Sequence, residues 1–273
     1  MAFHTVVFTS STSGSGATTF VQLNFKADVI VPTLNNGLQV PKQLYRLGFV
    51  GGVGTSLTNI RAQTPAFLPF PWPTFAPVNR GSGFESPPRV WDGFKYPLPM
   101  NPTDELDIYI AQNSGGSETE YVFVTLTDGT MQPPPMGRFF TVHATGSTTV
   151  TAGAFTTCQL TFDQAIPAGL YSVIGARAYS ATGQAFRLAP AMEPLWRPGG
   201  IAVKAYDQMD PAGQRGYIYD GQVIAPWGTW MTFYQNVPPQ LDMFCTSADS
   251  AQECWLDLIQ LNTTTVYTGG APL

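Results

Sequence analysis

Charged side chains are scarce in this sequence. Asp, Glu, Lys and Arg make up 11% of its 273 residues, against roughly a quarter in a typical soluble domain. The exterior must therefore consist mostly of Ser, Thr, Asn, Gln, Gly, Pro and apolar groups. Interspersed charge keeps monomers apart, so a surface with so little of it favours burial against neighbouring subunits. A secreted or sugar-binding β protein, which is also often rich in Thr and Ser, is the alternative explanation.

Basic clusters and long apolar runs are also lacking. The net charge is −5, and no run of Lys and Arg offers the clustered cations that phosphate binding needs, so we expect no direct nucleic-acid binding. The segment Met1–Phe8 lacks the basic and apolar regions of a signal peptide. No stretch approaches 18 uninterrupted apolar residues, so we expect no transmembrane segment. These features predict a protein made in the cytoplasm.

Signatures of catalysis are missing as well. The two histidines, His4 and His143, stand in no metal-ligand spacing. The sequence has no Gly-x-Ser-x-Gly, no phosphate-binding Gly loop and no His-Glu-x-x-His. We therefore expect no enzyme and no cofactor, although acidic loops are able to hold an incidental calcium ion. The carboxylates considered for a glycosidase pair or for calcium are Asp104, Glu105, Asp107, Asp207, Asp210 and Asp220.

Three cysteines are too few for a disulfide framework. A hairpin of residues 241–246 and 253–260, with its turn at 249–250, would place Cys245 opposite Cys254. Such a cross-strand thiol pair has two interpretations: a disulfide, or two buried thiols that replace an apolar contact. The third cysteine is Cys158.

Strand patterns, by contrast, occur throughout. Short segments rich in Val, Ile, Thr, Phe and Tyr alternate with Gly, Pro, Ser and Asn clusters, and no stretch longer than two turns has a helical period. The sequence therefore predicts an all-β protein. The expected strands are 3–9, 18–26, 43–50, 105–112, 119–127, 138–144, 155–163, 170–179, 216–224, 229–235, 240–246 and 253–261.

The sequence also repeats itself in collinear order. From residue 3 to residue 139 the displacement is 136, and later displacements drift only where loops could differ in length. One domain of about 130 residues, duplicated in tandem, explains this pattern. The matched segments are Phe3–Val7 with Phe139–His143, Thr18–Phe25 with Thr156–Phe162, Tyr45 and Gly48 with Tyr171 and Gly175, Arg61 to Pro69 with Arg187 to Pro194, Leu106–Tyr109 with Leu241–Phe244, and Glu120–Phe123 with Glu253–Leu256.

We therefore predict two tandem antiparallel jelly-roll or β-sandwich domains related by internal duplication. The first spans residues 1–130 and the second spans residues 138–273. Between them, residues 131–137 carry three consecutive prolines, which make a short and stiff linker.

A Pro-rich, aromatic segment at 62–101 is the most unusual loop, and the corresponding loop at 190–215 is more polar. Its rings either dock a neighbouring subunit or cap the end of their own barrel. The candidate interface or ligand-platform aromatics are Phe67, Phe70, Trp72, Phe75, Trp91, Trp196, Trp227 and Trp230.

This organisation resembles the double jelly-roll capsid proteins of viruses and phages. The resemblance is architectural, spans 3–127 and 138–261, and carries no residue-level motif. It implies a virion structural protein, capsid or capsid-associated, that assembles through charge-poor lateral faces into a homotrimer and contacts other virion proteins. The internal similarity equally fits a recent duplication of a single-roll protein, or a phage decoration or spike component. The rival function is a tandem carbohydrate- or receptor-binding protein whose sugar platforms would be Trp72, Trp196, Trp227 and Trp230.

Overall fold

The computed structural model describes residues 2–13, 16–54, 57–75, 90–93, 96–112, 117–129, 135–191, 196–202 and 229–261. Strands dominate these ranges, and their one helical element is the 3-10 turn η1 (Pro65–Phe67). Among the same residues, no helix has the length and apolar character needed to cross a membrane. The expectation of an all-β fold is confirmed.

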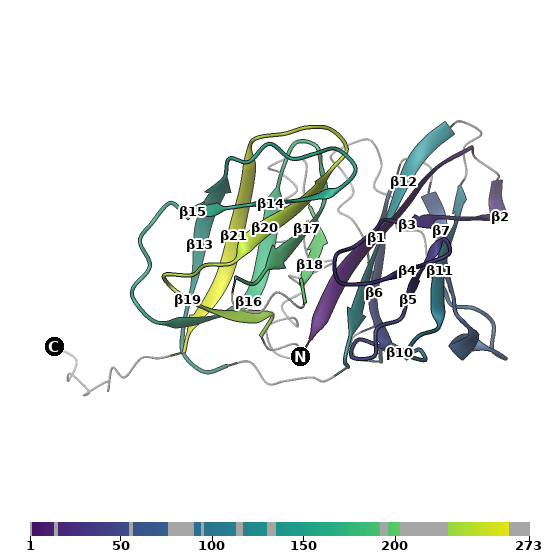
Figure 1. Cartoon of the computed structure of the whole chain (residues 1–273), viewed down its shortest axis with the longest axis horizontal. Coiled ribbons are helices and arrows are strands. Elements are labelled where there is room, and N and C mark those ends of the chain that lie inside the picture. The colour runs from purple at the N-terminus through teal and green to yellow at the C-terminus, as the bar shows by residue number, and fades with distance from the viewer. Residues whose placement is uncertain are drawn as a thin grey trace.

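The first half of the chain forms two antiparallel sheets, which we call roll one (Figure 1). One sheet has the order β10-β6-β12-β1-β3, with β9 on β6, and the other has the order β4-β5-β11-β7-β8, with β2 on β11. The strands are β1 (Phe3–Ser13), β2 (Gly16–Gln22), β3 (Asn24–Phe25), β4 (Thr33–Leu34), β5 (Gly37–Gln39), β6 (Arg46–Val53), β7 (Leu57–Gln63), β8 (Thr74–Phe75), β9 (Val90–Asp92), β10 (Leu98–Pro99), β11 (Glu105–Gln112) and β12 (Ser117–Thr127).

The second half forms roll two, again from two antiparallel sheets. Their orders are β15-β13-β21-β16-β19 and β14-β20-β17-β18. The strands are β13 (Arg138–Gly146), β14 (Phe155–Cys158), β15 (Leu160–Phe162), β16 (Leu170–Tyr179), β17 (Gly183–Ala189), β18 (Gly199–Ile201), β19 (Met231–Tyr234), β20 (Gln240–Cys245) and β21 (Gln252–Gln260).

Both rolls have jelly-roll topology. In roll one the main strands, taken in chain order as one to eight, are β1, β2, β6, β7, β8, β10, β11 and β12, and in roll two they are β13, β14, β16, β17, β18, β19, β20 and β21. In each roll the first sheet then has the order 1-8-3-6 and the second the order 2-7-4-5, which is the double Greek-key arrangement of a jelly roll. The predicted fold class is thus observed.

The strand registers of the two rolls correspond residue by residue. Phe8 pairs with Phe25 in roll one, and Ala144 pairs with Phe162 in roll two, so the first strands are displaced by 136 residues as the sequence predicts. Strand β6 bulges at Gly48, and β16 bulges at the corresponding Ile174. A shared bulge is a specific feature, because bulges are retained within related sheets.

Four of the sequence matches are shifted. Strand pairing aligns Gly48 with Ile174 and not with Gly175. It aligns Gln22 with Thr157 and not with Gln159. Val124 pairs with Val6, and Leu256 pairs with Val142, so Glu120–Phe123 corresponds to Gln252–Trp255 and not to Glu253–Leu256. A shift of one residue moves a side chain to the opposite face of a strand. Similarly, Tyr109 lies opposite Arg61 and Asp242 lies opposite Arg187, so Tyr109 corresponds to Asp242. The predicted match of Leu106–Tyr109 with Leu241–Phe244 is therefore shifted by two residues.

The predicted hairpin of Cys245 and Cys254 is wrong. Cys245 ends β20 in the 2-7-4-5 sheet, whereas Cys254 lies on β21 in the 1-8-3-6 sheet, where it pairs with Ala144 and Ala178. The two strands thus belong to facing sheets and not to one ladder. All three cysteines are free and buried, so a disulfide between them is absent.

The sequence also missed two long strands, β7 and β17, and six short ones: β4, β5, β8, β9, β10 and β18. Strand β17 (Gly183–Ala189) contains no Val, Ile or Thr, and it is buried along its whole length, so it lacks both β-branched residues and alternation. The expected strand at 216–224 lies outside the described residues.

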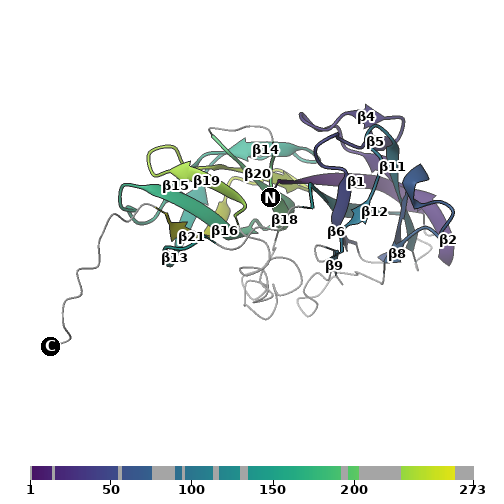
Figure 2. The ribbon, with the colours of Figure 1, turned by 90° about the horizontal axis from the view of Figure 1, so that it is seen from below.

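The two rolls stand side by side (Figures 1 and 2). Each has its own apolar core between its two sheets. The 2-7-4-5 sheet of roll two faces the 1-8-3-6 sheet of roll one, with β18 beside β1 and β12 (Figure 2). The 2-7-4-5 sheet of roll one and the 1-8-3-6 sheet of roll two consequently lie at the two ends of the molecule (Figure 1).

Candidate assembly surfaces

The contact between the two rolls has an apolar centre. Val7 on β1 and Phe123 on β12 pack against three roll-two residues, and all five are buried. Tyr121 of roll one meets the Phe244 ring edge-on at 5.8 Å between centroids. Val7 and Phe123 point away from the core of roll one, but roll two covers them, so they are buried in the contact. The three roll-two residues are Ala185, Ile201 and Phe244.

Beside this apolar centre lies a buried charged network centred on Arg187 of β17. Its guanidinium is ion-paired with Asp28 of roll one, and it also donates to Asp242 Oδ2 at 3.1 Å and to the Thr5 carbonyl oxygen at 3.2 Å. The Arg187 side chain is 2% exposed and lies 3.6 Å from the centroid of the Phe155 ring. A second cation, Arg197, reaches Asp242 at 2.5 Å.

His4 joins the network as a neutral side chain. Its Nδ1 accepts a hydrogen bond from the Arg197 backbone N–H at 3.0 Å, which leaves the proton on Nε2 to be donated to Asp28 Oδ1 at 3.1 Å. Burial lowers the pKa of His4, and the nearby guanidinium groups lower it further against the opposing effect of Asp28. The imidazole is therefore a fixed hydrogen-bond bridge between the rolls.

The charges in this network balance. Burial alone would raise the pKa of Asp28, but the hydrogen bond from His4 and the Arg187 guanidinium outweigh it and hold the pKa below its ordinary range. Two carboxylates, Asp28 and Asp242, thus face two guanidinium groups. Loss of one partner from such a buried set leaves an uncompensated charge and costs about 3–5 kcal/mol. The network therefore strongly disfavours separation of the rolls.

The open edge of β1 adds backbone hydrogen bonds. The Thr5 N–H donates to the Arg197 carbonyl at 3.1 Å, and the Thr5 hydroxyl donates to the Gly199 carbonyl at 3.1 Å. Strand β3 pairs with β1 only at Phe8 and Thr9, so β1 has a free edge at Thr5. Roll two covers that edge, which removes an exposed ladder.

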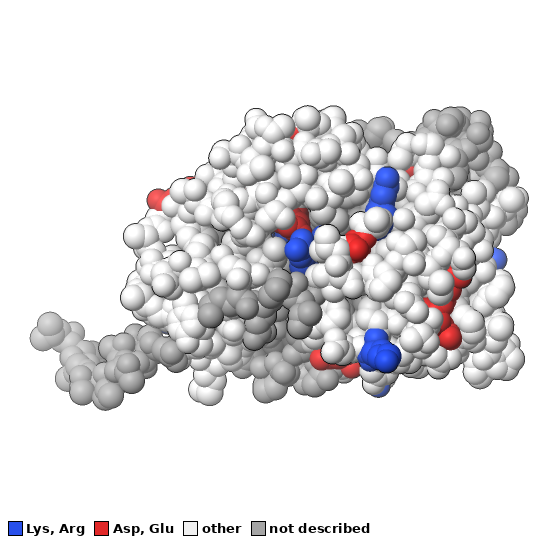
Figure 3. Space-filling model, viewed as in Figure 1, with Lys and Arg blue, Asp and Glu red and all other residues white. Residues whose placement is uncertain are grey.

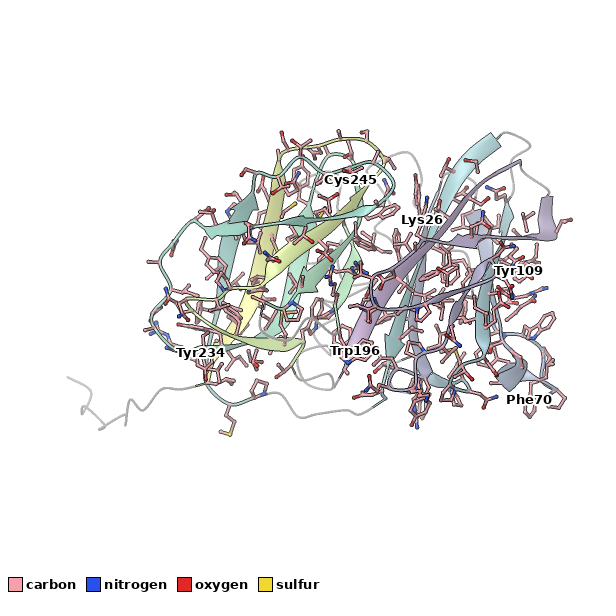
Figure 4. All side chains as sticks on the ribbon, viewed as in Figure 1. Lys26, Phe70, Tyr109, Trp196, Tyr234 and Cys245 are labelled. Carbon is pink, nitrogen blue, oxygen red and sulfur yellow. The ribbon has the colours of Figure 1, made fainter. Side chains whose placement is uncertain are left out.

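At the far end of roll one, the outer side of the 2-7-4-5 sheet carries a second arginine in the same position. Arg61 on β7 lies opposite Tyr109 on β11, and its guanidinium is 3.6 Å from the centroid of the Phe20 ring. We call the outward residues Phe20, Gln22, Asn59, Arg61 and Tyr109 the Arg61 face. Figure 4 places Tyr109 on the side of the molecule away from roll two.

At the opposite end, the outer side of the 1-8-3-6 sheet of roll two forms what we call the Trp255 face. Trp255 on β21 has its ring 4.5 Å from that of His143 between centroids, and its strand neighbour on the other side is Arg177. The Thr141 hydroxyl donates to Asp257 Oδ1 at 2.6 Å. His143 lies between Asp163 and Glu253. The face consists of Thr141, His143, Asp163, Arg177, Glu253, Trp255 and Asp257.

The candidate aromatics do not form one surface. Phe67 and Phe75 belong to the core of roll one, which agrees with a loop that caps its own barrel. Trp230 is buried in roll two and meets Phe3 edge-on, and Trp196 is half-buried beside His4. Of the candidates whose side chains the structure describes, only Phe70 and Trp72 are exposed, at 76% and 38%, with Phe70 at one corner of roll one (Figure 4). Trp227 and the side chain of Trp91 lie outside the described residues.

Among the described residues, no three His, Cys, Asp or Glu side chains are grouped to hold a metal ion. Of the carboxylates considered, Asp107 accepts from Gln22 at 2.8 Å and Glu105 accepts from Asn35 at 2.8 Å. Asp104 accepts from Asn101 at 3.0 Å. These contacts give the three carboxylates local structural roles. Asp207, Asp210 and Asp220 lie outside the described residues.

Charged groups are sparse over the face of the molecule in Figure 3. The described ion pairs gather instead at the contact between the rolls and on the Trp255 face. The network of His4, Asp28 and Arg187 was not predicted. The sequence signal that pointed to it was the match of Arg61 with Arg187 in the collinear segments.

Comparisons with known proteins give little at the level of sequence. No protein-family model and no curated protein matches this chain. Solved structures similar to it include the crystal structure of the major capsid protein P2 from Bacteriophage PM2, with 10% identity and a TM-score of 0.26, covering 96% of this chain and 99% of that chain. A TM-score this low supports no inference about this chain. The double jelly-roll assignment depends on the strand orders described above.

Proposed function

We propose that this chain is a virion structural protein, capsid or capsid-associated, that acts by self-assembly and without catalysis. The observation that carries the proposal is the pair of jelly rolls joined sheet to sheet through a buried interface, with one comparable sheet face left at each end. The architectural resemblance to double jelly-roll capsid proteins points the same way. Fold alone does not define function, so the argument depends on these faces.

The proposed assembly is a homotrimer. Two similar rolls per chain let a threefold assembly present six similar units, and a closed ring leaves no face unpaired. The low charge of the exterior favours lateral packing, because few ion-solvation shells must be removed. The location implied is the virion, with synthesis in the host cytoplasm.

Light scattering of the purified full chain at micromolar concentration tests this proposal. The expected mass is three times the 29.5 kDa of one chain. A monodisperse monomer would contradict self-assembly. The same sample, if trimeric, is the starting point for tests of the individual faces.

The alternative is a carbohydrate- or receptor-binding protein. The observation in its favour is that Phe70 and Trp72 are exposed within one Pro-rich segment, and exposed rings stack on sugar faces. A glycan array with Phe70→Ala and Trp72→Ala variants tests it. Glycan binding that these substitutions abolish, in a chain whose mass in solution they leave unchanged, would favour the alternative.

A further inference from the structure

We propose that the Arg61 face of one copy packs on the Trp255 face of a second copy, in the way that the Arg187 surface of roll two packs on roll one within the chain. The inference rests on the proposed self-assembly and names the two surfaces that would meet. Its basis is the correspondence between each exposed face and one side of the contact already present inside the chain.

The Arg61 face corresponds to the buried surface of roll two. Arg61 lies opposite Tyr109, which pairs with Gln22, and Arg187 lies opposite Asp242, which pairs with Thr157. Phe20 lies two residues before Gln22, and Phe155 lies two residues before Thr157. The Arg61 guanidinium is 3.6 Å from the centroid of the Phe20 ring, and the Arg187 guanidinium is 3.6 Å from the centroid of the Phe155 ring. The same guanidinium geometry is thus built on both sheets, but roll one has no neighbouring roll on that side (Figure 1).

The Trp255 face corresponds to the surface of roll one that roll two covers. The row Val7, Phe123 and Gly51 in roll one becomes His143, Trp255 and Arg177 in roll two. In the next row, the hydrogen bond between the Thr5 and Thr125 hydroxyls at 3.0 Å becomes the hydrogen bond from Thr141 to Asp257. Trp255 would therefore occupy the central position that Phe123 occupies in the internal contact.

The charges of the two faces complement each other at the arginine. Arg187 has one carboxylate on its own sheet, Asp242, and takes a second from roll one. In roll one Tyr109 stands in the place of Asp242 directly opposite Arg61, and the carboxylates of that face, Asp107 and Glu105, lie two and four residues further along β11. Around Trp255 the described acids, Asp163, Glu253 and Asp257, outnumber Arg177. In the proposed contact, Arg61 of a neighbouring copy would lie beside Asp257.

The backbone of the Trp255 face offers the same open edge. Strand β15 pairs with β13 only from Ala144 to Gly146, as β3 leaves β1 open at Thr5. Within the described part of the chain, no strand pairs with β13 at Thr141 on the side away from β21. In the internal contact, the carbonyl at this position accepts a hydrogen bond from Arg187. The Thr141 carbonyl would accept one from Arg61 of the second copy.

Because the two faces differ, the contact is head to tail. Such a contact closes into a ring or continues as a filament. In a closed ring of three copies, each internal contact would alternate with an intermolecular contact of the same type. A face-to-face dimer, by contrast, would leave half of these surfaces uncovered.

Charge reversal tests the proposed contact. Arg61→Glu should weaken self-association of the full chain by about tenfold or more, measured by sedimentation velocity over a concentration series, since like charges then meet at Asp257. Lys42→Glu is the matched control, because Lys42 is an exposed cation in another part of roll one. It should change association by no more than about twofold. Circular dichroism of each variant verifies that the fold is retained.

A second substitution gives the rescue. Thr141→Arg alone should also weaken association by about tenfold, and the double variant of Arg61→Glu with Thr141→Arg should return to within about threefold of the parent chain, because opposite charges face each other again. Failure of the double variant to recover would overturn the proposed contact.

Cross-linking gives a separate measurement. A chain carrying Arg61→Cys and Thr141→Cys should give covalently linked oligomers with a short bis-maleimide, whereas each single variant should not give them. A parent chain that is oligomeric by scattering, but whose double-cysteine variant does not cross-link, would overturn this contact and leave self-assembly standing. A monomeric parent chain would overturn the proposed function itself.

Discussion

Arg187 and Arg61 occupy the same position in two jelly rolls but have opposite environments. Both cover an aromatic ring at 3.6 Å, yet Arg187 is 2% exposed and paired with two carboxylates, whereas Arg61 lies half-buried on a face at the end of the molecule. The arginine surface of roll two is thus buried in the contact between the rolls, whereas the corresponding surface of roll one faces solvent.

Removal of Arg187 should destabilise the chain strongly. Arg187→Ala leaves Asp28 and Asp242 buried with too few partners, so the free energy of unfolding should fall by about 3–5 kcal/mol in urea titrations. The matched control, Arg61→Ala, should cost no more than about 1 kcal/mol in the dissociated chain, because it removes a solvent-screened side chain. Equal losses in the two variants would contradict the assigned role of the network.

Stability should depend on pH through His4. Its pKa is lowered on folding from the ordinary value of 6.5, so the unfolded chain binds the proton more readily. Stability is then fully present above about pH 6.5 and declines as the pH falls below that value. The depressed pKa of Asp28 adds a further loss below about pH 3.8.

The measurement for this prediction is thermal unfolding from pH 8 to pH 5. His4→Gln keeps an N–H donor for Asp28 and does not titrate, so its curve should be flatter between pH 6.5 and pH 5. A variant and parent with parallel curves would show that His4 does not carry the pH dependence.

The three thiols should be inert in the folded chain. Burial raises the pKa of Cys158 to about 11 and raises the pKa of Cys254 as well, so thiolate is scarce at neutral pH. Reaction with an aromatic disulfide reagent should be at least about 100-fold slower in buffer than in denaturant, where all three react. Rapid reaction of one thiol in buffer would contradict its burial.

Gly199 should tolerate no side chain. It lies on β18 at the contact between the rolls, where its carbonyl accepts from Thr5, and a Cβ there would overlap the Phe186 carbonyl oxygen. Gly199→Ala should lower stability by about 2 kcal/mol. For comparison, a Cβ at Gly153 meets no atom within 4 Å, so Gly153→Ala should cost only about 1 kcal/mol for its left-handed backbone. Calorimetric melting of both variants makes the comparison.

Much of the fold was predictable because strand patterns and repeats are local signals. Strands 105–112 and 170–179 were predicted with the bounds that β11 and β16 have. Strand β17 was missed because it is buried on both sides. One side faces the core of roll two and the other faces roll one, and a contact between two domains is a tertiary effect that no local sequence pattern reveals.

The charged network was not predictable for a related reason. Arg187 meets Asp28 and Thr5, which are 159 and 182 residues away in the sequence. Residue spacing gives no information on contacts of that range between two domains. The misplaced pairing of Cys245 and Cys254 has the same origin, since a jelly roll sends its seventh and eighth strands to different sheets.

Negative-stain imaging of the purified full chain tests the central claim most directly. Self-assembly through the two end faces predicts class averages with threefold symmetry and six similar lobes around a ring. Single two-lobed particles at micromolar concentration would contradict the account.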